Sequence, residues 1–104
     1  PMGVDCSGLT QLLWRTRGVH LKRDASQQAQ QGSVVQWWLD AKEGDLAFFG
    51  DEEGHINHVG LLLSPTEILH ASGEVRIDKF DQQGIYHSQL KKYTHQLRFI
   101  QRPG

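Results

Sequence analysis

Cysteine is almost absent from the sequence, because only one of the 104 residues, Cys6, is a cysteine. The chain therefore forms no internal disulfide, and cysteine usage indicates no redox compartment. A charge of one sign is also lacking: 11 Lys and Arg, dispersed along the chain, balance 12 Asp and Glu, which predicts no nucleic-acid partner. No apolar run approaches the roughly eighteen residues of a membrane span, and no signal peptide is evident. The length suits one domain with a single modest core.

The one cysteine lies where a loop is predicted to turn into a helix. Asp5 is a favourable N-cap residue, and the helix is predicted to run from Cys6 to Arg17 and to end at Gly18. Apolar side chains at helical spacing would face the core, namely Leu9, Leu12, Leu13 and Trp14. In the first turn, unpaired N–H groups and the positive end of the helix dipole favour a thiolate and supply a donor for an oxyanion. Cys6 is therefore a candidate nucleophile, and the alternative is a buried structural cysteine.

A second, short helix is predicted after Asp24. Asp24 and Gln27 form a capping box, and Gly32 ends the helix, whose Gln-rich face predicts a position over the surface rather than in the core. The aromatic pair Trp37-Trp38 follows. These rings are expected in the core, with a groove wall or a buried contact with another domain as alternatives.

From Lys42 onward the apolar pattern changes from helical to strand-like spacing. Five short strands are predicted, at Asp45–Phe49, His58–Leu63, Ile68–Ala71, Val75–Ile77 and Gln96–Ile100. The polar stretch Asp81–Lys92 is expected to be a loop with one turn of helix. Strands that follow helices predict an α+β domain in which the first helix packs on one face of a five-stranded antiparallel sheet.

Two of the six histidines, His58 and His70, stand inside apolar strand runs. Their rings share a face only if the register of the hairpin is even. A three-residue connection drawn from residues 64–67 predicts that register, whereas a two-residue Pro65-Thr66 turn predicts opposite faces. The alternative for each is a core histidine that is hydrogen-bonded to the backbone. The other four, His20, His55, His87 and His95, are expected to be solvated.

Together these residues indicate the chemistry of a cysteine hydrolase. Cys6 attacks a carbonyl group, His58 takes and returns the proton, and His70 holds the His58 ring in the useful tautomer. Zinc binding by the same three residues is disfavoured, because structural zinc sites need four ligands and usually a closely spaced pair. No metal or other cofactor is predicted.

Five stretches, in this order, resemble the NlpC/P60 peptidases of bacterial cell walls. They are Asp5-Cys6-Ser7-Gly8-Leu9, Arg23-Asp24-Ala25-Ser26 with Gln28, Gly44-Asp45-Leu46-Ala47-Phe48-Phe49, His58-Val59-Gly60 and His70-Ala71-Ser72. The segment from Arg98 to Arg102 resembles the family's last strand. The resemblance implies a papain-like fold and cleavage of the bond between γ-D-glutamate and a diamino acid in murein peptides.

By the same resemblance, Cys6, His58 and His70 match the family's catalytic triad. It also implies that Asp5 and Ser7 help to hold the N-terminal amine of the substrate, and that Asp24 and Ser26 close the same end of the groove. Murein peptides or peptidoglycan would be the substrate, in a secreted or cell-envelope setting, with cytoplasmic recycling as the alternative.

The resemblance also bears on the extent of the protein. Family members usually carry a Tyr and a Trp-Gly-Gly stretch just before the nucleophile loop, and often SH3-like domains ahead of it. Residues 1–104 are therefore expected to be one catalytic domain at the C-terminal end of a longer protein. Two other functions stay open: a papain-like murein amidase, against which His70 argues, and a non-catalytic wall-binding module.

Overall fold

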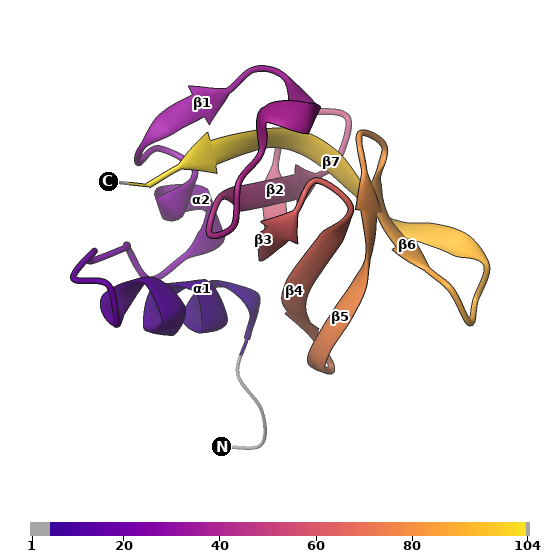
Figure 1. Cartoon of the computed structure of the whole chain (residues 1–104), viewed down its shortest axis with the longest axis horizontal. Coiled ribbons are helices and arrows are strands. Elements are labelled where there is room, and N and C mark those ends of the chain that lie inside the picture. Colours follow the sequence, from indigo (N-terminus) through magenta and orange to yellow (C-terminus); the bar gives the residue numbers. More distant parts are fainter. Residues whose placement is uncertain (1–4, 104) are drawn as a thin grey trace.

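The helices come first in the chain and the strands follow. The computed structural model describes residues 5–103. Its elements are α1 (Cys6–Arg15), α2 (Ala25–Gln28), β1 (Ser33–Val35), the 3₁₀ turn η1 (Trp38–Asp40), β2 (Leu46–Gly50), β3 (Ile56–Ser64), β4 (Glu67–Ser72), β5 (Glu74–Asp81), β6 (Gly84–His87) and β7 (Lys92–Arg102). Figure 1 shows α1 and α2 on one side of the strands. Among the described residues, neither helix is long and apolar enough to cross a membrane.

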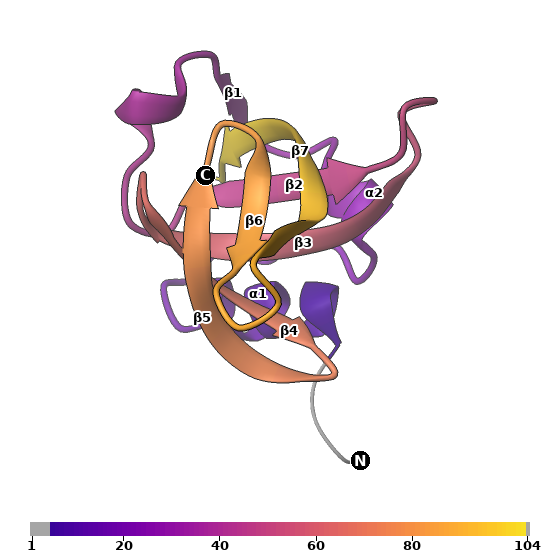
Figure 2. The same ribbon diagram turned by 90° about the vertical axis from the view of Figure 1, so that its right-hand side faces the viewer.

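The strands form one antiparallel sheet that closes on itself. Their order is β1-β7-β2-β3-β4-β5-β6, and β6 also pairs with β7, which makes a six-stranded barrel with β1 as an extra strand (Figure 2). The α+β class is confirmed, but the prediction of five strands is wrong. The two missed strands, β1 and β6, are three and four residues long. Both pair with β7, so their extended form depends on a distant partner rather than on their own pattern.

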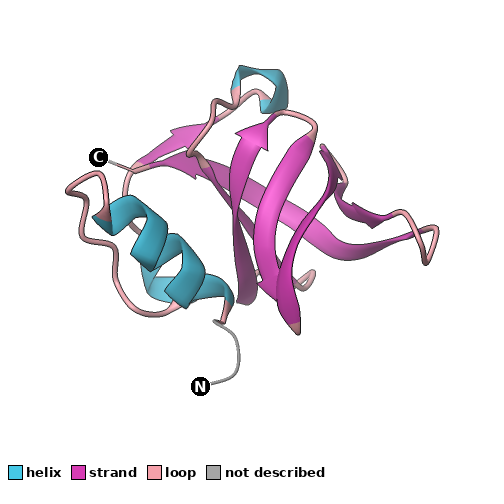
Figure 3. Ribbon diagram, turned by 60° about the horizontal axis from the view of Figure 1, so that its bottom comes forward, coloured by secondary structure: helices cyan, strands magenta, loops and turns pink. Residues whose placement is uncertain are grey.

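Helix α1 begins where the sequence predicts and ends two residues earlier than expected. The carboxylate of Asp5 accepts a hydrogen bond from the Gly8 N–H at 2.7 Å, which caps the first turn. Gly18 has a φ of +79° and its N–H donates to the Arg15 carbonyl, so the chain leaves the helix as a C-terminal glycine allows. The helix lies against β3 and β4 (Figure 3).

Two apolar clusters cover the two faces of the sheet. The first joins the sheet to the helices and contains Leu21, Leu46, Phe48 and Val59, with Cys6 and Trp14 of α1 packed against it. The second contains residues that alternate with these along the strands: Ala47, Phe49, Leu62, Ile68, Phe80, Ile85 and Ile100, together with Ala41. Because side chains alternate across a strand, this second cluster fills the inside of the barrel.

Helix α2 departs from the sequence prediction in one respect. The capping box of Asp24 and Gln27 is confirmed, but Gln28, expected on a surface face, is completely buried. Its side-chain amide donates to the Ser7 carbonyl and to the Lys22 carbonyl, and its oxygen accepts from Thr10. A glutamine that satisfies its donors and its acceptor in this way can be buried, and here it fastens α2 to α1.

The two adjacent tryptophans lie in different surroundings. Trp38 packs against the barrel cluster and its indole N–H donates to the Pro65 carbonyl at 2.7 Å. Trp37 remains 62% exposed, so the expectation that both rings are in the core is wrong for Trp37. Trp37 is the N-cap residue of the turn η1, and Trp38 is the first residue of the turn.

Candidate active site

The hairpin of β3 and β4 carries the two histidines singled out in the sequence. Ser64 pairs with Glu67, so the connection is the two-residue Pro65-Thr66 turn and not the predicted three-residue one. A two-residue turn alone would place the rings on opposite faces. A β-bulge between Leu62 and Ser64 adds the missing residue, however, and beyond it Leu62 pairs with Ile68. The bulge restores the even register that brings the two histidines to one face.

His58 and His70 meet across that hairpin. The Nε2 atom of His58 lies 2.9 Å from Nδ1 of His70, and the two rings are perpendicular. Both side chains are buried, with 6% and 1% of their surface exposed. The prediction that the two rings face the same side of the sheet is confirmed. Gly60 lies close to both strand neighbours on this face: a Cβ there would lie 2.5 Å from Cδ1 of Ile68 and 3.1 Å from the Cβ of His70.

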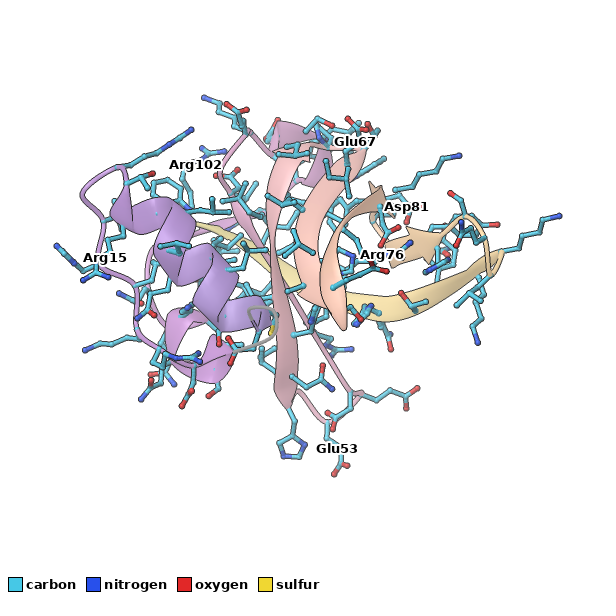
Figure 4. The ribbon with its side chains drawn as sticks, turned by 90° about the horizontal axis from the view of Figure 1, so that it is seen from below. Arg15, Glu53, Glu67, Arg76, Asp81 and Arg102 are labelled. Atoms are coloured by element: carbon cyan, nitrogen blue, oxygen red, sulfur yellow. The ribbon has the colours of Figure 1, made fainter. Side chains whose placement is uncertain are left out.

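A carboxylate that the sequence analysis missed continues the chain of hydrogen bonds. Nε2 of His70 lies 2.7 Å from Oδ2 of Asp78, which is 9% exposed. Arg76 donates to both oxygens of Asp78, at 3.0 and 3.1 Å. The signal was present in the alternation of Arg76 and Asp78, which puts both on one face of a strand. Figure 4 shows Arg76 on β5.

His95 is a third histidine at this site. The ring of His95 stacks on that of His58, with centroids 4.2 Å apart and planes 25° from parallel. It is half-buried and also lies in a T-shaped arrangement with the ring of Phe49, so the expectation that it is solvated is wrong. Its strand, β7, was predicted to begin only at Gln96, whereas it starts at Lys92 and closes the barrel beside β2.

Burial keeps these rings neutral. Loss of contact with water, with smaller contributions from His95 and His70, lowers the pKa of His58 to about 3. Burial also lowers the pKa of His70, although its hydrogen bond with Asp78 acts in the opposite direction. The pKa of His95 is lowered chiefly by burial as well. At neutral pH His58 therefore carries one proton and one free lone pair, as a general base must.

Cys6 is the first residue of α1, and its thiol is free. It is half-buried against the cluster that includes Val59, the neighbour of His58 in β3. Among residues 5–103 no hydrogen bond joins the thiol to His58. The structure thus brings the helix start to the strand that carries His58, and the reaction between the two groups stays a prediction.

The four residues predicted to bind substrate fall at the starts of the two helices. Arg23 links two of them: its guanidinium donates to Asp5 at 2.7 Å and to Ser7 Oγ at 3.0 Å. The hydrogen bonds that Asp5 accepts from Arg23 and from the Gly8 N–H lower the pKa of Asp5. Asp24 caps α2, and both it and Ser26 are exposed. Substrate binding by these residues stays a prediction, and Arg23 is an additional cation at the same place.

A polar hollow of about 330 Å³ opens beside His58. Its walls are Phe49, Gly50, Asn57, His58, Thr94, His95 and Gln96. Within the described residues, a separate group, Asp51, Glu53 and His55, holds three possible metal ligands within 4.8 Å of one another, but all three are exposed. Figure 4 shows Glu53 at the far end of the β2–β3 loop, pointing away from the sheet.

Comparison with known families supports this site. It combines a cysteine at the start of a helix with two paired histidines on a hairpin. The sequence model of the NlpC/P60 family matches residues 1–98. The chain belongs to the NlpC/P60 family. A curated relative, the gamma-D-glutamyl-L-lysine dipeptidyl-peptidase of Bacillus subtilis (strain 168), is 42% identical over 71 residues, which are 66% of this chain and 24% of the relative. This NlpC/P60 chain spans less than a third of the length of the curated relatives that it matches.

Solved structures share the fold of this NlpC/P60 domain. A family protein from Bacillus cereus ATCC 10987 superposes with a TM-score of 0.75 at 24% identity, over 94% of this chain and 31% of that chain. RipD of Mycobacterium tuberculosis, a non-catalytic NlpC/p60 domain protein adapted to peptidoglycan binding, superposes with a TM-score of 0.71 at 27% identity, over 96% and 67%. The family therefore includes both enzymes and binding modules.

Proposed function

We propose that this domain is a cysteine peptidase that hydrolyses murein peptides at the bond between γ-D-glutamate and a diamino acid, in the cell envelope. The observation that carries the proposal is the His58–His70 hydrogen bond, which engages Nε2 of a neutral His58 and leaves its Nδ1 free of His70. The name of the Bacillus subtilis relative supports the substrate class. No cofactor takes part in the proposed reaction.

Each step of the reaction has a residue to perform it. Cys6 Sγ attacks the γ-glutamyl carbonyl carbon while Nδ1 of His58 takes the thiol proton. The start of α1 supplies positive potential and free N–H groups near the developing negative charge. His58 then gives its proton to the leaving amine, and a thioester to Cys6 remains. Water, deprotonated by His58, hydrolyses the thioester and frees the thiol.

Asp5, Ser7, Asp24 and Ser26 have a proposed role in holding the substrate. A free N-terminal amine is a cation, and the carboxylates of Asp5 and Asp24 would attract it. Arg23 already forms an ion pair with Asp5. The two carboxylates and one guanidinium together carry one net negative charge, which a single ammonium group would balance. These residues would favour peptides that end in a free amine over intact cross-linked murein.

A binding module without turnover is the second candidate. It is favoured by the likeness to RipD and by the thiol of Cys6, which has no hydrogen bond to His58 among the described residues. Such a module would hold the same peptide in the same groove. The two candidates differ in one measurable quantity, the appearance of cleaved product.

The proposal is tested by incubating the chain with γ-D-glutamyl-L-lysine and γ-D-glutamyl-diaminopimelate peptides and following products by mass spectrometry. We expect cleavage by the native chain and a loss of roughly a thousandfold or more in both Cys6→Ala and His58→Ala, because a nucleophile and its base act as a unit. His55→Ala, which alters an exposed histidine, is the matched control and should keep full activity.

Two results would contradict the proposal in different ways. Turnover by the Cys6→Ala chain would show that another group is the nucleophile. Peptide binding without any turnover by the native chain would favour the binding module.

A further inference from the structure

Asp78 lies at the end of a line of groups that starts at the proposed base. His58, His70 and Asp78 come from three neighbouring strands, β3, β4 and β5. The hydrogen bonds along the line are 2.9 Å and 2.7 Å long, and all three side chains are buried. A buried line of this kind restricts where each proton can sit, because every donor must face an acceptor.

The carboxylate of Asp78 determines which atom donates in each hydrogen bond of the line. Burial acts to raise the pKa of Asp78, but hydrogen bonds from Arg76 and His70, with the charge of Arg76, outweigh it and lower the pKa. An ionised carboxylate only accepts, so His70 must carry its proton on Nε2. A neutral His70 then has only a lone pair on Nδ1, and His58 must donate to it from Nε2. The lone pair of His58 is left on Nδ1, the ring atom that is not engaged by His70.

This ordering holds only while His70 stays neutral, and the surroundings favour that state. If His70 were protonated, its Nδ1–H would point at His58 and force the proton of His58 onto Nδ1. The groups that face or act on His70 are Asp78 and Arg76 of β5, His58 of β3, His95 of β7 and His87 of β6. Burial, Arg76 and His87 lower the pKa of His70 and only Asp78 raises it, with a net lowering.

We infer that Asp78 is a positioning residue that sets the tautomers of His70 and His58, so that Nδ1 of His58 is the basic atom. The inference rests on the proposed function, because the tautomer of His58 matters for catalysis only if Cys6 is the nucleophile. Arg76 has a supporting part, since its two hydrogen bonds keep Asp78 ionised and in place. Asp78 touches neither the nucleophile nor the base and acts through His70.

The tautomers themselves provide the first test, and they are measured without any substrate. Proton–nitrogen correlation spectra of labelled histidine distinguish an Nδ1–H ring from an Nε2–H ring. In the Cys6→Ala chain, where no thiol exchanges a proton with His58, we expect both His58 and His70 as Nε2–H. In Cys6→Ala/Asp78→Asn the amide can donate, so the Nδ1–H form should appear for both rings. An Nδ1–H form of either ring with Asp78 intact overturns the inference, whether or not the Asp78 variant folds.

Activity provides the second test. We expect Asp78→Asn to lower kcat/KM for a γ-D-glutamyl peptide by roughly tenfold to a hundredfold, with the loss in kcat, because substrate contacts are unchanged. Asp78→Glu keeps a carboxylate and should recover part of the rate. Asp81→Asn is the matched control: it makes the same change of charge on β5, where Asp81 bonds Tyr93 instead of a histidine. Its activity should equal that of the native chain.

The two tests separate a failure of this inference from a failure of the proposed function. Rings that stay Nε2–H in the Asp78→Asn chain, with full activity, overturn the role of Asp78 and leave the peptidase intact. A native chain that never cleaves peptide overturns the peptidase, and the spectra still decide whether Asp78 sets the tautomers.

Discussion

His58 differs from an exposed histidine because its ring is buried beside two other rings. His70 bonds one edge of it, and His95 covers one face at a centroid distance of 4.2 Å. Both neighbours, like burial itself, disfavour a positive charge on His58. A ring with so low a pKa stays unprotonated throughout the physiological range, so it keeps a free lone pair, and the same burial makes it a weaker base than an exposed histidine.

The same burial predicts a loss of stability in acid. In the unfolded chain a histidine has a pKa of about 6.5, whereas that of folded His58 is about 3. Between these values the unfolded state binds more protons, so the free energy of unfolding is fully retained above pH about 6.5 and falls as the pH is lowered toward 3. The slope is up to ~1.4 kcal/mol per pH unit for each such histidine. His70 and His95, whose pKa values are also lowered, act in the same direction.

Urea unfolding between pH 7 and pH 4, measured on the native chain and on His58→Gln, checks this prediction. The variant should show a shallower fall in unfolding free energy, because one buried titrating group is gone. His20→Gln changes an exposed histidine and should keep the native slope. Equal slopes in the native chain and His58→Gln would mean that His58 titrates normally in the fold.

At the scale of elements, the start of α1 is held in place by α2. Gln28 of α2 makes three hydrogen bonds, of 2.7 to 2.9 Å, to the Ser7 and Lys22 carbonyls and to the Thr10 hydroxyl. Ser7 follows Cys6 directly, so this contact fixes the first turn of the helix that carries the proposed nucleophile. A four-residue helix has little stability of its own, and the buried amide is what ties it to the domain.

Replacing Gln28 should therefore lower the stability of the fold. We expect Gln28→Ala to lower the free energy of unfolding by about 2–4 kcal/mol, because buried partners lose their hydrogen bonds and a cavity remains. Gln30→Ala removes an exposed glutamine two residues further along and should change it by less than about 0.5 kcal/mol. Urea denaturation of both variants measures the difference, and similar values for the two would argue against a structural role for Gln28.

At the scale of the whole molecule, β7 joins the parts of the fold. It pairs with β1, β2 and β6, and so both closes the barrel and carries His95 to the site. Near its end Arg102 donates to both oxygens of the buried Asp45, at 2.9 and 2.8 Å. Asp45 also accepts from the Lys42 N–H, in the turn that precedes β2. One carboxylate thus connects the last strand to the start of β2.

This connection predicts a stability effect far from the site. Asp45→Asn should lower the free energy of unfolding by about 2 kcal/mol, since two hydrogen bonds to a charged group are weakened at a buried position. Asp40→Asn makes the same change at an exposed position nearby and should have little effect. Thermal unfolding followed by circular dichroism compares the two. An Asp45→Asn chain as stable as the native one would show that the ion pair does not hold the barrel closed.

The sequence by itself determined the features that depend on near neighbours along the chain. The cap at Asp5, the helix that begins at Cys6, the approximate places of five strands and the choice of His58 and His70 all follow from local spacing. Each signal needs only a few consecutive residues, because caps and alternation are properties of single elements. The family resemblance is carried by the same short stretches.

Only the tertiary structure decided which distant residues meet. The bulge before Ser64 offsets a two-residue turn that alone would place the two histidines on opposite faces. The pairing of β6 with β7 closes the barrel. This closure places His95, which was expected at the surface, beside His58. Alternation within β5 puts Asp78 on one face with Arg76, but its place beside His70 comes from the register of β4 and β5. The surroundings of a polar side chain depend on what lies across the sheet, and so its charge state and its partners are settled only when the chain folds.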